Sequence, residues 1–133
     1  MERRHRTARR LLGERGAAAV EFALVVPVLL MLLMGIVEFS KAYNAQATLS
    51  AAAREAARTM ALANDPTQAR AIAQTAAGSL GSAATITISP TTCASDGSST
   101  VTVTMTYRQT FASGLLGQSG VDVVGKAAMR CAR

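Results

Sequence analysis

The stretch GAAAVEFALVVPVLLMLLMGIV, residues 16–37, decides the architecture of this chain. From Ala17 onward it is 21 residues long and contains one charged side chain, that of Glu21. Because a helix rises about 1.5 Å per residue, the segment is about 31 Å long and matches the roughly 30 Å hydrocarbon core of a bilayer. The stretch therefore predicts a single transmembrane helix, in which Pro27 is expected to introduce a kink.

Basic residues concentrate before this segment and set its expected orientation. Residues 1–16 hold six of the fourteen Lys and Arg residues against two glutamates, which accounts for most of the net charge of +6. Basic flanks of membrane spans stay on the cytoplasmic side. We therefore expect a basic cytoplasmic leader at 1–16, a transmembrane helix at 17–39, and an extracytoplasmic location for everything that follows.

The composition argues against two common classes of function. The leader contains no Phe, Tyr or Trp for base stacking, so we expect no nucleic-acid binding. Beyond Val37 there is no histidine, and the carboxylates are scattered along the chain. Because catalysis needs a convergent set of titratable or nucleophilic groups, we expect no enzyme, and we see no spacing that predicts a metal or cofactor site.

Apolar residues of helical spacing continue beyond the predicted membrane segment. They are Ala42, Ala45, Leu49, Ala52, Ala56, Met60 and Ala63. The spacing predicts an extracytoplasmic helical stalk at 40–63. Its narrow, alanine-rich seam fits two compatible roles, which are packing on its own domain and close approach of another helix.

A second, shorter helix is expected at the start of a small α+β head, residues 64–133. Asp65 is a predicted N-cap, Pro66 suits the first helical position, and Gln68 completes a capping-box pattern. The helix should run to about Ala77 and end at the following glycine.

Alternation with a period of two then predicts strands. The clearest are at 85–88 and 100–107, and a weaker third strand spans 121–130, with Gly125 as a candidate bulge. The glycine-containing region between the second and third strands reads as a loop. The expected fold class is α+β, with the long N-terminal helix, a short helix, and an antiparallel meander of about three strands.

Two cysteines lie in the predicted head, where disulfides persist on the outer side of the membrane. In a meander the first and third strands run in the same direction, so their carboxyl ends meet at one edge of the sheet. Cys93 follows the first strand and Cys131 ends the third. This placement predicts a disulfide between them, since two cysteines and a lone histidine in the leader are too few ligands for a metal.

The segment GAAAVEFALVVPVLLMLLMGIVEFSKAYNAQATLSAAAREAAR, residues 16–58, resembles the TadE-like pseudopilins of the tight-adherence (Flp) pilus system. The shared features are a glycine after a basic tail, Glu21 five residues later, Phe22, the in-helix Pro27, and the sequences GIVEF and AAREAAR. The resemblance implies cleavage after Gly16 by a prepilin peptidase in the bacterial cytoplasmic membrane. Ala17 would then become the new amino terminus.

The resemblance also gives Glu21 and Phe22 an expected role in assembly. Glu21 lies one helical turn after the new ammonium group, which the helix dipole disfavours, and can compensate it within its own chain or in a neighbour. We therefore expect a minor or accessory pseudopilin, because the head is larger than the short major pilin of such systems. Its expected partners are the lipid bilayer, the prepilin peptidase, other pilins or pseudopilins and the assembly machinery.

Two other interpretations stay open from the sequence. In the first, a signal peptidase cuts after the A-x-A pattern of Ala45-Gln46-Ala47 and releases a secreted protein. In the second, the chain is an uncleaved single-pass anchor that presents an outer binding domain. The amino-terminal residue of the protein in native membranes separates the three.

Overall fold

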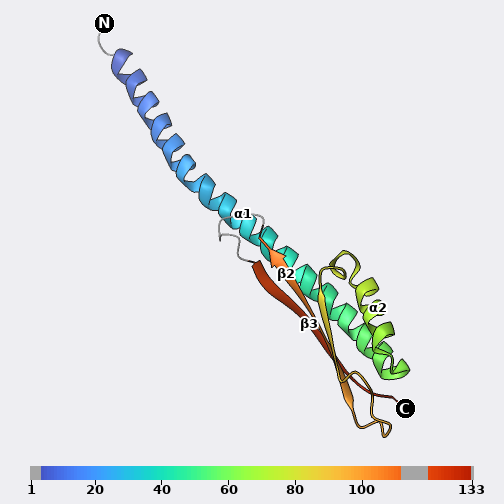
Figure 1. The fold of residues 1–133 in the computed structure, drawn as a ribbon. Helices are drawn as coiled ribbons and strands as arrows, with labels where there is room; N and C mark the ends of the chain where they lie inside the picture. Colours follow the sequence, from blue (N-terminus) through green and yellow to red (C-terminus); the bar gives the residue numbers. More distant parts are fainter. Residues whose placement is uncertain (1–3, 112–119, 133) are drawn as a thin grey trace. The chain divides into compact units, whose positions relative to one another are not determined.

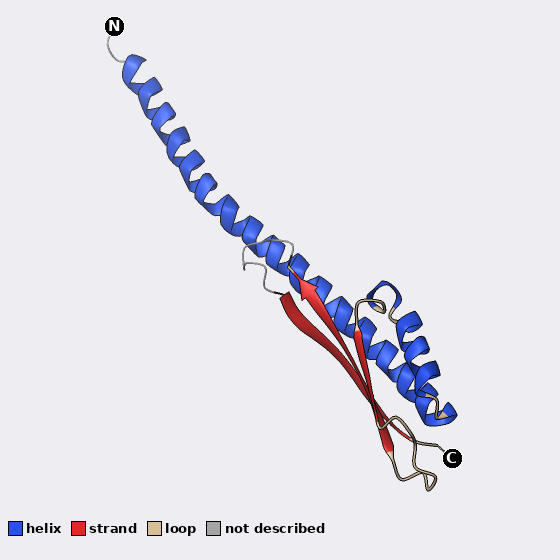
Figure 2. Ribbon diagram, viewed as in Figure 1, coloured by secondary structure: helices blue, strands red, loops and turns tan. Residues whose placement is uncertain are grey.

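The computed structural model describes residues 4–111 and 120–132, with side chains from Gly16 onward. Its elements follow in the order α1 (Arg4–Ala63), α2 (Pro66–Ala76), the 3-10 helix η1 (Gly78–Leu80), β1 (Thr85–Ser89), β2 (Thr100–Thr110) and β3 (Gly120–Arg130), as Figures 1 and 2 show. The chain divides into two compact units, residues 1–37 and residues 38–133. The expected α+β fold is confirmed: a long apolar helix precedes a short helix and a three-stranded antiparallel sheet.

The turn between α1 and α2 forms as its polar residues predict. Asn64 adopts a positive φ of 51° directly after α1, a conformation that Asn tolerates at a helix end. The Asp65 carboxylate accepts hydrogen bonds from the N–H groups of Thr67 and Gln68, at 2.8 and 3.1 Å, and Pro66 occupies the first turn. These bonds satisfy N–H groups that the start of a helix leaves without partners.

The sheet is a meander with the strand order β1-β2-β3 and antiparallel pairing throughout. On its inner face, Val101, Val103 and Met105 are fully buried, and the threonines between them face outward. The strand β2 runs three residues beyond the predicted end at Tyr107, because its ladder with β3 continues to Thr110. Part of the predicted loop that follows, residues 112–119, lies outside the described residues.

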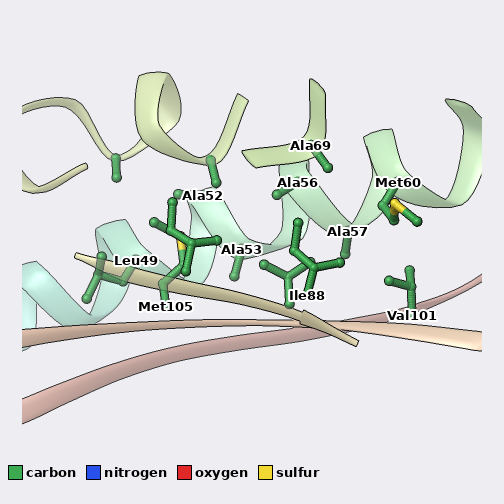
Figure 3. Packing of buried hydrophobic residues seen from close by; sticks show 14 of the residues in the cluster. Leu49, Ala52, Ala53, Ala56, Ala57, Met60, Ala69, Ile88, Val101 and Met105 are labelled. Atoms are coloured by element: carbon green, nitrogen blue, oxygen red, sulfur yellow. The ribbon is translucent and has the colours of Figure 1, made fainter. Parts of the chain in front are cut away.

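The second unit buries a wider face of α1 than the predicted seam. The seam residues from Ala45 to Met60 are buried, whereas Ala63 is exposed. A second row, Ala53, Ala57 and Ala61, is buried beside them. Two rows are needed because α2 contacts one side of α1 and the sheet contacts the other (Figure 3).

Small side chains let the two helices of this unit approach closely. Ala56 of α1 and Ala69 of α2 lie next to each other in Figure 3, and both are fully buried. Leu49, Met60 and Met105 are the large side chains that fill the space between helices and sheet. Of the two roles expected for the seam, packing within its own domain accounts for the buried residues.

Gly125 has a different role from the bulge that the sequence predicts. The register of β2 with β3 is regular through the pair Met105 and Gly125, so no residue is inserted there. A Cβ atom on Gly125 would overlap the α1 backbone at Leu49 and Ser50. The prediction of a bulge is wrong, and the glycine is required because β3 crosses the backbone of α1 at close range.

Candidate processing and assembly site

The α1 segment at residues 16–37 exposes apolar side chains on every side. Its most apolar 18-residue window has a mean hydropathy of 2.6, and none of that window is buried within the described part of the chain. The exposed large side chains include Val20, Phe22, Leu24, Val28, Leu30, Leu32, Leu33 and Ile36. A core helix of a soluble protein would have one face covered, so length, composition and exposure together indicate a membrane anchor.

Among the residues whose side chains the structure describes, none gives Gly16 a steric reason to be glycine. A Cβ atom at this position would meet nothing within 4 Å, and the residue lies inside the helix. Glycine in a helix interior costs about 1 kcal/mol relative to alanine. A residue that weakens its own helix and relieves no contact is consistent with a requirement set by another molecule.

Glu21 and Phe22 lie on α1 beyond the predicted cleavage position. The Glu21 side chain is exposed, and it follows Ala17 by four residues, which places both on one face of the helix. Phe22 is 70% exposed on a neighbouring face. The described structure therefore leaves both side chains accessible to a partner, and their assembly role stays a prediction.

Pro27 lies inside α1, which continues through it. Proline removes one N–H donor and crowds the carbonyl four residues earlier, so it is the expected position of any bend. The kink itself stays a prediction.

The predicted disulfide between Cys93 and Cys131 is present, with the two Cα atoms 5.9 Å apart. The Cys93 N–H donates to the side-chain oxygen of Asn64, at 2.6 Å, and the Ser99 hydroxyl donates to the Cys131 sulfur, at 3.3 Å. The Ala132 N–H also donates to the carbonyl of Ala61, at 3.1 Å. The end of β3, the loop after β1 and the end of α1 are thus joined at one point.

The described part of the second unit contains a pocket. A shallow pocket of about 270 Å³ is lined by Lys41, Asn44, Ala45, Thr48, Ala77, Ser79, Leu80 and Gln109. Its lining has a single charged group and no carboxylate, thiol or imidazole. Among the residues that the structure describes, no three His, Cys, Asp or Glu side chains come together to hold a metal ion.

A comparison with protein families matches part of α1 and no other element. Residues 16–58 match the family of TadE-like proteins. The resemblance seen in the sequence is thereby confirmed, and a TadE-like segment implies a protein associated with the tight-adherence pilus. No curated protein and no solved structure matches the chain significantly.

The TadE-like segment contains more than the candidate processing residues. It begins at Gly16, includes Glu21 and Phe22, and extends into the second unit as far as Arg58. Its last part therefore contributes the buried alanines from Ala45 to Ala57 to the core of that unit. The first half of this segment exposes apolar side chains, and its second half is packed within the second unit.

Some residues that organise the head were not identified from the sequence. Arg70 donates a hydrogen bond from Nη1 to the carbonyl oxygen of Ile86, at 2.7 Å, and so connects α2 to β1. An arginine on an amphipathic helix reads as a solvated charge, and only its position beside the sheet reveals the contact. The second alanine row has a signal in the sequence, because Ala53, Ala57 and Ala61 recur every four residues.

Proposed function

We propose that this chain is a minor or accessory pseudopilin of the tight-adherence (Flp-type) pilus assembly system. A prepilin peptidase removes the basic leader after Gly16, and the processed chain associates with other pilins or pseudopilins through its N-terminal helix. The observation that carries the proposal is the position of Glu21, one helical turn after Ala17 on a helix whose apolar side chains are exposed. The match of residues 16–58 to TadE-like proteins supports it.

Charge pairing gives Glu21 its role in this mechanism. A charged side chain within a membrane span costs roughly 2.5–3.5 kcal/mol on insertion scales, so it is retained where it has a function. Cleavage before Ala17 creates an ammonium group at a helix amino terminus, where positive charge is unfavourable. The Glu21 carboxylate neutralises that group, in its own chain or in a neighbouring helix, and both charges then avoid lipid.

The head is extracytoplasmic in this proposal, and the leader is cytoplasmic. The arginines of residues 1–16 favour this orientation, and the Cys93–Cys131 disulfide fits an oxidising compartment.

Release by a signal peptidase fits the packing less well. A cut after Ala47 would fall inside α1. It would remove Ala45, which is 4% exposed and belongs to the core of the second unit. It would also place a charged terminus at Thr48, one residue before the buried Leu49. A folded head is therefore more compatible with an α1 that is not cut at this position.

The test is Glu21→Gln, which keeps the shape of the side chain and removes its charge. We expect processed protein to accumulate normally in membranes, because the helix becomes more apolar. Association should weaken, since a charge at a helix terminus contributes up to about 2 kcal/mol, or about thirtyfold in an association constant. Surface pili and crosslinked complexes that contain the subunit are the quantities to measure.

Glu55→Gln is the matched control, because Glu55 is an exposed carboxylate on the same helix but outside the apolar segment. It should leave pili and complexes unchanged. Normal pili and normal complexes in the Glu21→Gln strain would disprove the charge-pairing mechanism.

A further inference from the structure

The outer edge of β3 carries backbone groups that point away from the sheet. The strand order makes β3 an edge strand. Beyond its end, the Cys131 N–H donates to the carbonyl of Ser99, at 3.0 Å, in the same register as the ladder. Because N–H and C=O groups alternate between the two sides of an antiparallel strand, odd-numbered residues of β3 face β2. The even-numbered residues from Gly120 to Arg130 direct their backbone N–H and C=O groups outward.

The two edges of the sheet differ in how they are protected. At the β1 edge, the Arg70 guanidinium donates to the carbonyl of Ile86, and the strand is only five residues long. At the β3 edge, which is eleven residues long, no described residue makes a hydrogen bond to an outward-pointing backbone group. Open edges pair readily with another strand, so β3 is the edge that is available.

The side chains of β3 limit which strand fits this edge. On the outer face of the sheet, Asp122, Val124 and Lys126 follow one another at alternate positions, and all three are exposed. In an antiparallel copy of the same strand this order is reversed, so the acidic residue of each strand lies opposite the basic residue of the other. Opposite charges that face each other across a strand pair stabilise it, and like charges destabilise it.

We propose that two copies of this chain pair through their β3 edges, antiparallel, about a two-fold axis at Val124. Asp122 then lies opposite Lys126 of the partner subunit, and the reverse pair forms on the other side of the axis. Val124, which is 43% exposed, packs against its symmetry mate. The two sheets join into one continuous sheet, and each copy uses the same surface, as a two-fold interface requires.

The alternative registers are less favourable. An axis at Asp122 or at Lys126 would place like charges opposite each other. An axis at Val123 or Gly125 keeps the outward backbone groups paired but leaves both charges without a partner across the strands. Within each chain, Arg108 already pairs with Oδ1 of Asp122, at 3.0 Å, and the second carboxylate oxygen can accept from a lysine.

Crosslinking of the full-length protein in detergent micelles tests the proposed axis. Val124→Cys places two thiols at the axis, while Cys93 and Cys131 are already joined. A short bis-maleimide should therefore give covalent dimers. Thr104→Cys lies on the same face of the central strand β2, and in the joined sheet both β3 strands separate it from its mate. This variant should give few covalent dimers. Equal dimer yields from the two variants would overturn the proposal.

Charge variants in the Val124→Cys background test the register. Lys126→Glu alone and Asp122→Lys alone each oppose like charges, and should lower the dimer yield by about tenfold. Mixing the two variants restores opposite charges in the heterodimer, so crosslinking should return. Arg54→Glu, on the exposed surface of α1, should have no effect. An undiminished dimer yield in the Lys126→Glu variant would contradict the register. So would a mixture in which both variants retain their native disulfide and crosslinking does not return.

Discussion

Two glycines have opposite environments in this chain, and the difference separates function from packing. A Cβ atom at Gly125 would overlap the α1 backbone, whereas a Cβ atom at Gly16 would have no described neighbour within 4 Å. The fold therefore explains Gly125 and leaves Gly16 without a structural reason. In the proposed function, the reason is a peptidase that must accommodate the backbone before the cut.

Gly16→Leu tests this requirement. We expect insertion to persist, because the substitution adds an apolar side chain to an apolar helix, and we expect cleavage to stop. The uncleaved protein should migrate more slowly than wild type by the mass of sixteen residues, in a host that contains the peptidase. Wild-type mobility of the variant would show that the proposed site is wrong.

At the scale of elements, the packing of β3 on α1 depends on the absence of a side chain. Gly125→Ala should destabilise the head by about 1–3 kcal/mol, because overpacking against backbone cannot be relieved by a rotamer change. Chemical denaturation measures the loss of unfolding free energy. Lys126→Ala, on the outer face of the same strand, should change it by less than about 0.5 kcal/mol. Equal stability of the two variants would contradict the close crossing.

Periodicity predicted these elements because each exposes one face to water and buries the other. The alternation from Thr100 to Tyr107 gave β2 and its inner face, and Asp65 with Pro66 gave the start of α2. The contacts between elements were not predictable in the same way. The role of Gly125 depends on which backbone crosses it, and that of Arg70 depends on a carbonyl in a different element.

The candidate site was predictable to the extent that it lies within one helix. The spacing from Ala17 to Glu21 is fixed by helical geometry, so its shared face follows from the sequence. Predicting the disulfide required more information, namely the order and direction of three strands. The predicted meander supplied both. The meander also makes β3 an edge strand, but the sequence did not show whether another element covers that edge.

For the whole molecule, the disulfide stabilises the head. It closes a loop with a sequence separation of 38 residues. In the chain-entropy model this contributes roughly 4 kcal/mol. Cys93→Ala should therefore make the second unit sensitive to protease, whereas Thr92→Ala at the exposed neighbouring position should not. Complete alkylation of both cysteines in native protein without reductant would exclude the disulfide.

The central claim concerns the mature form of the chain, and the amino-terminal residue of the protein isolated from native membranes tests it directly. A processed pseudopilin predicts Ala17 as that residue, because the leader ends at Gly16. A terminus at Met1 or Glu2 would instead show an uncleaved anchor, and Thr48 would show a secreted protein cut after Ala47. Either of those results would contradict the proposed processing and the charge pairing that depends on it.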